Sequence, residues 1–132
     1  MASKFKVKNG PGILTLEEVV IGSQMTPVAV HLRQETAPGS GIMQDMDLTN
    51  KEWACHVKDN LKADVQPDTE ITAVARVPLT GGWMDLYLDG TKTATLREGT
   101  YYGSLKVWPT GSEELGDTVL VIELPLKYEA TR

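Results

Sequence analysis

Short runs in which apolar and polar residues alternate, separated by glycine and proline, limit most strongly how this chain can fold. Its 12 glycines and 7 prolines are scattered along 132 residues rather than gathered into a linker. A period of two residues is that of a β-strand with one buried face. The clearest run is "WMDLYLD", Trp83 to Asp89, in which Met84, Leu86 and Leu88 are expected to point inward. This pattern indicates a protein built from strands.

Further runs of β-rich composition follow the same punctuation, at residues 14–21, 28–35, 70–78, 101–109 and 117–129. Six or seven short strands spaced by turn residues are typical of an antiparallel sandwich or barrel. In the last run, Pro125 removes a ladder donor, so that strand is expected to be at an edge or bulged there. Asp89-Gly90 is a dipeptide that tight hairpin turns favour.

The segment "DLTNKEWACHVKD", Asp47 to Asp59, fits two structures. Thr49 and Glu52 have the spacing of a helix capping box, and apolar residues from Trp53 onward recur at helical spacing. The same residues also alternate. Because Trp, Cys and His are mediocre helix formers, and a lone helix would need an open sheet face, we predict a strand from Trp53 to Lys58, with a helix as the alternative.

Charge and composition exclude several classes of protein. The chain has 13 basic and 18 acidic residues, a net charge of −5, and no cluster of the Lys and Arg that phosphate binding needs, so nucleic acid is not an expected partner. No apolar run is long enough to cross a membrane, and no signal peptide is recognisable. Cys55 is the only cysteine, which excludes an intrachain disulfide and a cysteine-based metal cluster. We expect synthesis in the cytoplasm.

Reactive side chains are few. Cys55 and His56 are the only pair that resembles a nucleophile with its base, but neighbouring strand residues point to opposite faces. We therefore interpret Cys55 as a buried structural thiol and His56 as a surface residue. Asp45 and Asp47 lack the glycine and distal glutamate of a calcium loop, so a solvated turn is expected there. The sequence predicts no enzyme, no cofactor and no metal.

Candidate contact residues are aromatic or lie near the N-terminus. Phe5 and Val7 alternate with lysines, so this segment can add a strand to its own sheet or to a neighbour's edge, or be a frayed tail. Trp83, Tyr102 and Trp108 are candidates for a protein contact surface or for a platform that stacks sugars. Trp108, beside a proline at a strand end, is the favoured exposed contact.

Four segments in order resemble a domain widespread in tailed-phage virion proteins, typified by the N-terminal region of baseplate upper proteins. They are "MTPVAVHLRQ", "DLTNKEWACHVKD", "LTGGWMDLYLDGTKTATLREGTYYGSLKVW" and "LVIELPLKYEATR", which lie between residues 25 and 132. The resemblance implies a strand after the Asp-Leu-Thr step, in agreement with the interpretation of Trp53 to Lys58. The first two dozen residues have no counterpart in that family, and its Arg-Gly-Asp-Thr-like entry is replaced by "GSQMTP".

The resemblance and the strand pattern together predict an all-β fold. It would be an antiparallel immunoglobulin-like β-sandwich of about seven to eight strands, with an N-terminal arm at residues 1–13 and a single sandwich domain at residues 14–132. The expected protein is a non-enzymatic virion structural protein, made in the host cytoplasm, that binds other virion subunits and itself. We place it in the tail or baseplate. The alternatives are a capsid decoration (cement) protein and a module that binds carbohydrate or a host receptor.

Overall fold

A computed structural model describes residues 2–4, 12–16, 18–37, 39–59 and 67–128. The strands are β1 Ala2–Lys4, β2 Gly12–Thr15, β3 Val19–Val20, β4 Val28–His31, β5 Arg33–Glu35, β6 Met43–Asp45, β7 Lys51–Lys58, β8 Thr69–Ala75, β9 Trp83–Tyr87, β10 Gly99–Pro109 and β11 Asp117–Lys127. The helical turns are η1 Leu79–Gly81, α1 Gly90–Thr93 and η2 Glu113–Leu115. The predicted all-β class is confirmed.

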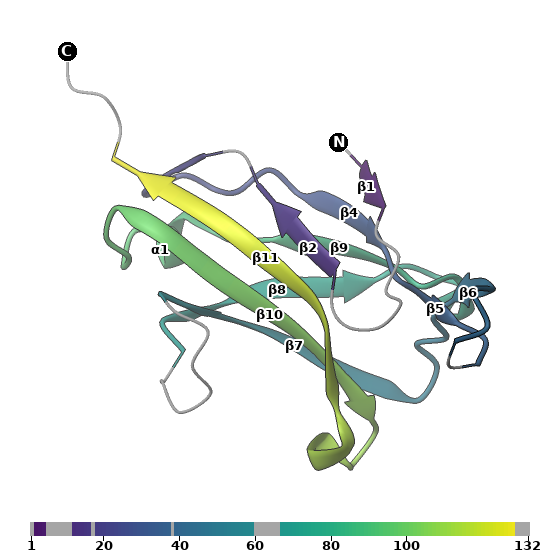
Figure 1. Cartoon of the computed structure of the whole chain (residues 1–132). Coiled ribbons are helices and arrows are strands. Elements are labelled where there is room, and N and C mark those ends of the chain that lie inside the picture. The colour runs from purple at the N-terminus through teal and green to yellow at the C-terminus, as the bar shows by residue number, and fades with distance from the viewer. Residues whose placement is uncertain (1, 5–11, 17, 38, 60–66, 129–132) are drawn as a thin grey trace.

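One curled sheet forms two layers because β8 has different partners along its length. Its first part, Thr69–Ile71, pairs with β7, and its second part, Thr72–Ala75, pairs with β9. The strand order is β1-β4-β9-β8-β7-β10-β11-β2, with β3 also paired to β11. Figure 1 shows β10, β11 and β2 lying in front of β4, β9 and β8, and β7 extends the front layer by its pairing with β10. We call these the β10 layer and the β9 layer.

Strand pairing is mixed, which corrects the expectation of a purely antiparallel sheet. The central pairs are antiparallel, but β1 pairs parallel with β4, and β2 and β3 pair parallel with β11. The described parts of the predicted arm therefore extend both layers of their own chain. Ala2–Lys4 adds a strand to the β9 layer, and Gly12–Thr15 adds one to the β10 layer. This second strand crosses the boundary expected between residues 13 and 14. Alternation in the sequence sets which face is buried, but it does not set the direction of a partner strand.

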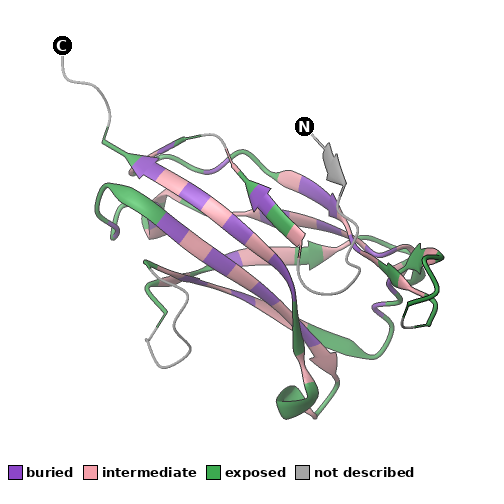
Figure 2. Cartoon of the chain, in the orientation of Figure 1, coloured by how far each residue is buried: buried purple, intermediate pink, exposed green. Residues whose placement is uncertain are grey.

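The core lies between the two layers and follows the predicted alternation. Met84, Leu86 and Leu88 are at most 1% exposed, and alternate residues of β11 from Leu120 to Leu126 are also buried. Figure 2 shows this as alternating buried and half-buried bands along β10 and β11. Burying one such aliphatic side chain contributes about 1.5–3 kcal/mol, so these faces supply much of the folding free energy.

The segment from Asp47 to Asp59 is a turn followed by a strand, as predicted. The backbone N–H of Thr49 donates to the carboxylate of Asp47 at 2.9 Å, and Asn50 has a φ of 58°. This left-handed residue ends the turn, and β7 then pairs along its length with β10. The pairing energy of a central strand therefore outweighs the capping-box signal of Thr49 and Glu52.

Pro125 lies between the part of β11 that pairs with β2 and the part that pairs with β3. It faces Thr100 across the ladder with β10. On the other side, β2 pairs with β11 up to Glu123, and the pairing of β11 with β3 begins at Leu126. In the described residues neither short strand is registered opposite Pro125, so the missing N–H interrupts no assigned pair, as its chemistry requires.

Asp89-Gly90 does not form the tight hairpin turn that its sequence favours. Gly90 begins the helical turn α1, and a Cβ atom placed on it would lie 2.5 Å from the carbonyl oxygen of Gly22. Glycine is needed here for close packing rather than for a turn. Beside it, the fully buried Thr93 accepts a hydrogen bond from the N–H of Gly22 at 2.9 Å, and its hydroxyl lies 3.0 Å from the carbonyl oxygen of Ser23.

Replacing Thr93 by valine tests this tether. The substitution keeps the shape of the side chain but leaves the N–H of Gly22 without its acceptor. We expect the free energy of unfolding, measured by urea denaturation, to fall by about 1–3 kcal/mol. Thr95→Val is the matched control, because Thr95 is exposed and its hydroxyl donates only to the carbonyl of Lys92 within its own turn. Equal stability of the two variants would contradict the role assigned to Thr93.

Candidate functional site

The predicted aromatic contact residues do not share one face. Trp83 lies in β9 next to the inward-facing Met84, so it points outward from the β9 layer. Tyr102 and Trp108 lie in β10 and point outward from the other layer. Phe5 and Val7 lie outside the described residues. A sugar-binding platform would place all three aromatic side chains on one flat surface. The structure does not place them so, because Trp83 lies on a different layer from Tyr102 and Trp108.

Trp108 is tied to its own chain. Its Nε1 donates to Oε1 of Glu52 at 3.3 Å, and the same oxygen accepts the N–H of Gly111 at 3.1 Å. A Cβ atom at Gly116 would lie 2.9 Å from the Cβ of Trp108, so the η2 connection packs directly on this side chain. Tyr102 is six positions away on the same strand, roughly 20 Å by the rise of a β-strand. Neither aromatic extends the other's surface.

Trp83 instead lies at the centre of a row of three side chains, between His31 of β4 and Arg76, the residue that follows β8. His31 of β4 is in register with Trp83, and their rings stack with centroids 4.4 Å apart and planes 5° from parallel. The Arg76 guanidinium carbon lies 5.6 Å from the centroid of the indole. Because β4 and β8 flank β9 on opposite sides, the indole is held between imidazole and guanidinium. Its flat faces are occupied, so a sugar ring cannot stack there without displacing one of them.

Arg76 is also clamped by a carboxylate. Its Nε and one terminal nitrogen donate to the two oxygens of Asp85 at 2.8 and 2.6 Å, a bidentate pair. This contact lowers the pKa of Asp85, chiefly through the hydrogen bonds, and raises the pKa of Arg76. The side chains remain 49% and 35% exposed, so the pair presents both of its charges to a potential partner.

A second carboxylate lies at the other end of the row. Asp45, expected in a solvated turn, belongs to β6, which forms a hairpin with β5. Its Oδ1 lies 2.9 Å from Nε2 of His31 and 3.3 Å from Nε of Arg33, but neither nitrogen is aligned on it for a hydrogen bond. Negative charge therefore stands beside His31 and Arg33, and the local charges are nearly balanced.

Exposed aliphatic side chains adjoin this row. Val74 is in register with Asp85 and is 48% exposed, and Val77, just after β8, is 90% exposed. Arginine and aromatic residues are enriched in protein interfaces, and exposed aliphatic groups gain free energy when they are covered. We call the outer surface made by Val74, Arg76, Trp83 and Asp85, together with the exposed Val77 in the bend that follows Arg76, the Val74 face. It has the composition of a contact surface.

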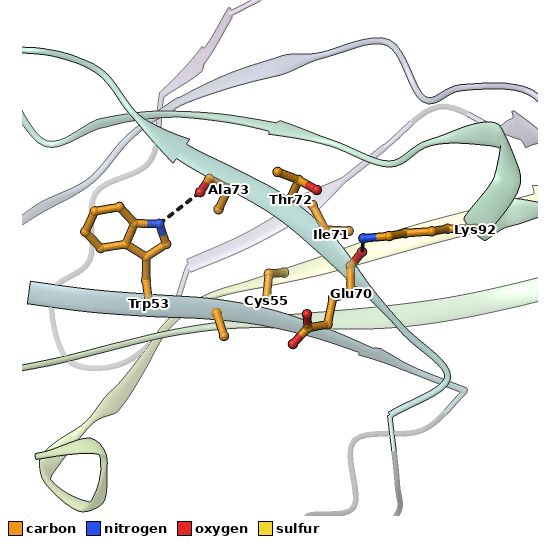
Figure 3. A pocket seen from close by; sticks show the side chains of 8 residues that line it. Trp53, Cys55, Glu70, Ile71, Thr72, Ala73 and Lys92 are labelled. Carbon is orange, nitrogen blue, oxygen red and sulfur yellow. Dashed lines mark hydrogen bonds between the residues drawn. The ribbon is translucent and has the colours of Figure 1, made fainter. Parts of the chain in front are cut away.

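A small cavity opens where β7 and β8 separate (Figure 3). Its volume is about 200 Å³. Beyond the Cys55–Ile71 pair the ladder ends, and the indole N–H of Trp53 donates to the carbonyl oxygen of Ala73 at 2.9 Å in place of a backbone donor. Lys92 reaches the carbonyl oxygen of Glu70 at 3.2 Å. The cavity is a by-product of the division of β8.

Cys55 and His56 diverge as predicted. The thiol is 1% exposed, and burial, with a smaller effect from Glu70, raises its pKa to about 12. His56 lies on the outer face, where its Nε2 is 2.7 Å from a carboxylate oxygen of Glu70. Since the thiolate is the nucleophilic form, this arrangement does not make a catalytic dyad. Among the described residues, no three His, Cys, Asp or Glu side chains are grouped to hold a metal ion.

Comparisons with known proteins identify no family. No family model matches the chain, and no curated protein matches it. Among solved structures, the N-terminal domain of phage TP901-1 ORF48 aligns over 96% of this chain and 98% of its own, at 6% identity and a TM-score of 0.46. The structure of PbICP-C in complex with falcipain-2 aligns over the same shares at 14% identity and a TM-score of 0.46. At this level of similarity neither neighbour identifies a function for this chain. In the part of the chain that the structure describes, no helix is long and apolar enough to cross a membrane.

The Arg76–Asp85 pair predicts a pH-dependent difference in stability. We expect Asp85→Asn to unfold at lower urea concentration than the wild type at pH 7. Because the pKa of Asp85 is lowered in the folded protein, the stability from its charge is complete above the usual aspartate pKa of about 3.9 and is lost as the pH falls through the lower, folded-state pKa. The difference between the two proteins should therefore shrink toward about pH 2. Asp89→Asn, at an exposed position whose side chain makes no cap hydrogen bond, serves as control. A difference that is constant with pH would contradict the ionic pair.

Burial of Cys55 predicts an unreactive thiol. We expect labelling by an aromatic disulfide reagent at about pH 8 to be at least a hundredfold slower in the native protein than in urea, because the thiolate is disfavoured and the sulfur is covered. Absorbance of the released thiolate gives both rates. Labelling of the native protein at the rate of the unfolded chain would show that the cavity above Cys55 admits reagents and that the thiol is accessible.

Proposed function

We propose that this protein is a non-enzymatic structural component of a bacteriophage virion that packs an outer sheet face against neighbouring subunits. The four-segment resemblance between residues 25 and 132 supports the virion role. The Val74 face, with its exposed aliphatic side chains around a fixed aromatic and charged row, carries the proposal that the protein works by surface contact.

The Val74 face is suited to contact because little of it needs to be ordered on binding. Trp83 is held between His31 and Arg76, and Arg76 is held by two hydrogen bonds to Asp85. Immobilising a free arginine or other long side chain on binding costs roughly 0.5–1.5 kcal/mol. Here Arg76 and Trp83 are already ordered in the folded chain, so binding loses little further side-chain entropy. Covering Val74 and Val77 then adds favourable free energy at about 25 cal/mol per Å² of apolar surface.

We place the contact on this face rather than on the N-terminal segment. In the described residues, Ala2–Lys4 is paired with β4 and Gly12–Thr15 with β11 of the same chain. Assembly through these strands would require them to leave their present partners, whereas the Val74 face is available without any rearrangement. In a repeating lattice, many weak contacts of this kind would add, because each bound copy raises the effective concentration of the next contact.

The tail or baseplate is the proposed location, because the resemblance is to a baseplate domain. The capsid exterior, with this protein as a decoration subunit, is the alternative and uses the same face. Carbohydrate binding is less well supported, since Trp83 has its flat faces covered and lies on the opposite layer from Tyr102 and Trp108.

Immunogold electron microscopy tests this function. Antibodies raised against the purified protein would be applied to intact particles from the strain that carries the gene, with pre-immune serum as control. We expect gold on the tail end of the particles. Gold on the head would support the capsid alternative and contradict the tail placement. Particles that carry no gold and lack the protein by mass spectrometry would overturn the virion role.

A further inference from the structure

We infer that the Val74 face binds a second copy of this chain in a two-fold, face-to-face contact. The inference deepens the proposed function by naming the partner of that face, and it rests on that function only for the choice of surface. Three observations carry it: the pattern of charge on the face, the position of its exposed valines and the net charge of the whole chain.

The charges of the face are self-complementary. Arg76 and Asp85 lie side by side, bidentately paired, and each is partly exposed. In an isologous contact, a surface meets its own copy rotated by 180°. A two-fold axis that passes beside this pair places the guanidinium of one copy over the carboxylate of the other, and the reverse. Four charges then alternate in sign, an arrangement that is attractive in every neighbouring pair.

The valines lie where such a contact would cover them. Val74 is in register with Asp85 on the neighbouring strand, and Val77 follows Arg76 directly in sequence. They are 48% and 90% exposed in the single chain. Single exposed aliphatic residues are common on protein surfaces. Here Val74 lies on the strand beside a rigid ion pair and Val77 lies in the adjoining bend, so a contact that covers both has an apolar part and a charge-matched part.

The net charge of the chain limits where two copies can meet. At −5, two copies repel each other over most of their surfaces. A self-contact is therefore favoured where positive and negative groups balance. On the Val74 face Arg76 offsets Asp85, and in the adjoining hairpin Arg33 lies beside Asp45. A partner surface of a single charge sign would oppose either Arg76 or Asp85, whereas a second copy matches both groups, which favours a second copy as the occupant.

Charge exchange tests the contact. Sedimentation velocity over a range of concentrations would be measured for the wild type, for Arg76→Asp and for Asp85→Arg. We expect concentration-dependent dimers for the wild type and at least tenfold weaker association for each variant alone, because like charges then face each other across the axis. An equimolar mixture of the two variants should associate again, because the Val74 face of the first variant then carries two acidic side chains and that of the second carries two basic ones. Loss of folding cannot produce this recovery.

Two further variants complete the test. Val77→Ser, at a position 90% exposed, should fold normally and weaken dimerisation. Leu115→Asp, at another exposed apolar residue in η2 on the β10 layer, should leave it unchanged. A wild type that stays monomeric at millimolar concentration, or variants whose mixture does not associate, would overturn the inference. Gold on virions would still support the proposed function in that case, so the two failures can be told apart.

Discussion

The division of β8 between two partner strands is the constraint on which the rest of the structure depends. Thr69–Ile71 continues the ladder of β7, while Thr72–Ala75 belongs to the ladder of β9. At the point of change the carbonyl of Ala73 loses a backbone donor, and the indole N–H of Trp53 replaces it at 2.9 Å. A fully buried carbonyl without a donor would cost about 1–3 kcal/mol, and that of Ala73 is partly buried, so the hydrogen bond from Trp53 stabilises the bend that lets one sheet close over its own core.

The same bend determines what appears on the surface. Once the second half of β8 is aligned with β9, Val74 lies opposite Asp85, and the N–H of Arg76 donates to the carbonyl of Trp83 at 2.8 Å. Arg76 can then reach both the indole and the carboxylate. On the other side of β9, the register with β4 brings His31 against the same indole. The Val74 face is thus a product of backbone register, and a shift of one residue in β8 would turn Arg76 toward the core.

Sequence patterns predicted the buried faces of β9 and β11, left that of β8 open, and did not identify the partners of the strands. Alternation identified Met84, Leu86 and Leu88 as core residues, and it placed Trp53–Lys58 in a strand against a capping-box signal. Alternation could not show that the outer strands β1, β2 and β3 pair in parallel, because a strand has the same period of two residues whichever way its neighbour runs. Nor could it show that Gly90 is required by the backbone of Gly22, a contact between residues far apart in sequence. The pairing of His31 with Trp83 was missed for the same reason, since each residue alone looks like an ordinary strand residue.

Trp83 and Trp108, both half-buried, show why composition alone did not locate the proposed contact surface. Trp108 was favoured because it stands beside a proline at a strand end, but its indole N–H is engaged by Glu52, and η2 covers part of the side chain. Trp83 is in the middle of a layer, and its ring faces are occupied by His31 and Arg76. Its contribution to binding would then be indirect: it fixes the guanidinium in position, while the valines supply apolar area and the Arg76–Asp85 pair supplies orientation. A surface of this kind discriminates between partners by the sign and spacing of charge, because apolar area by itself is poorly selective.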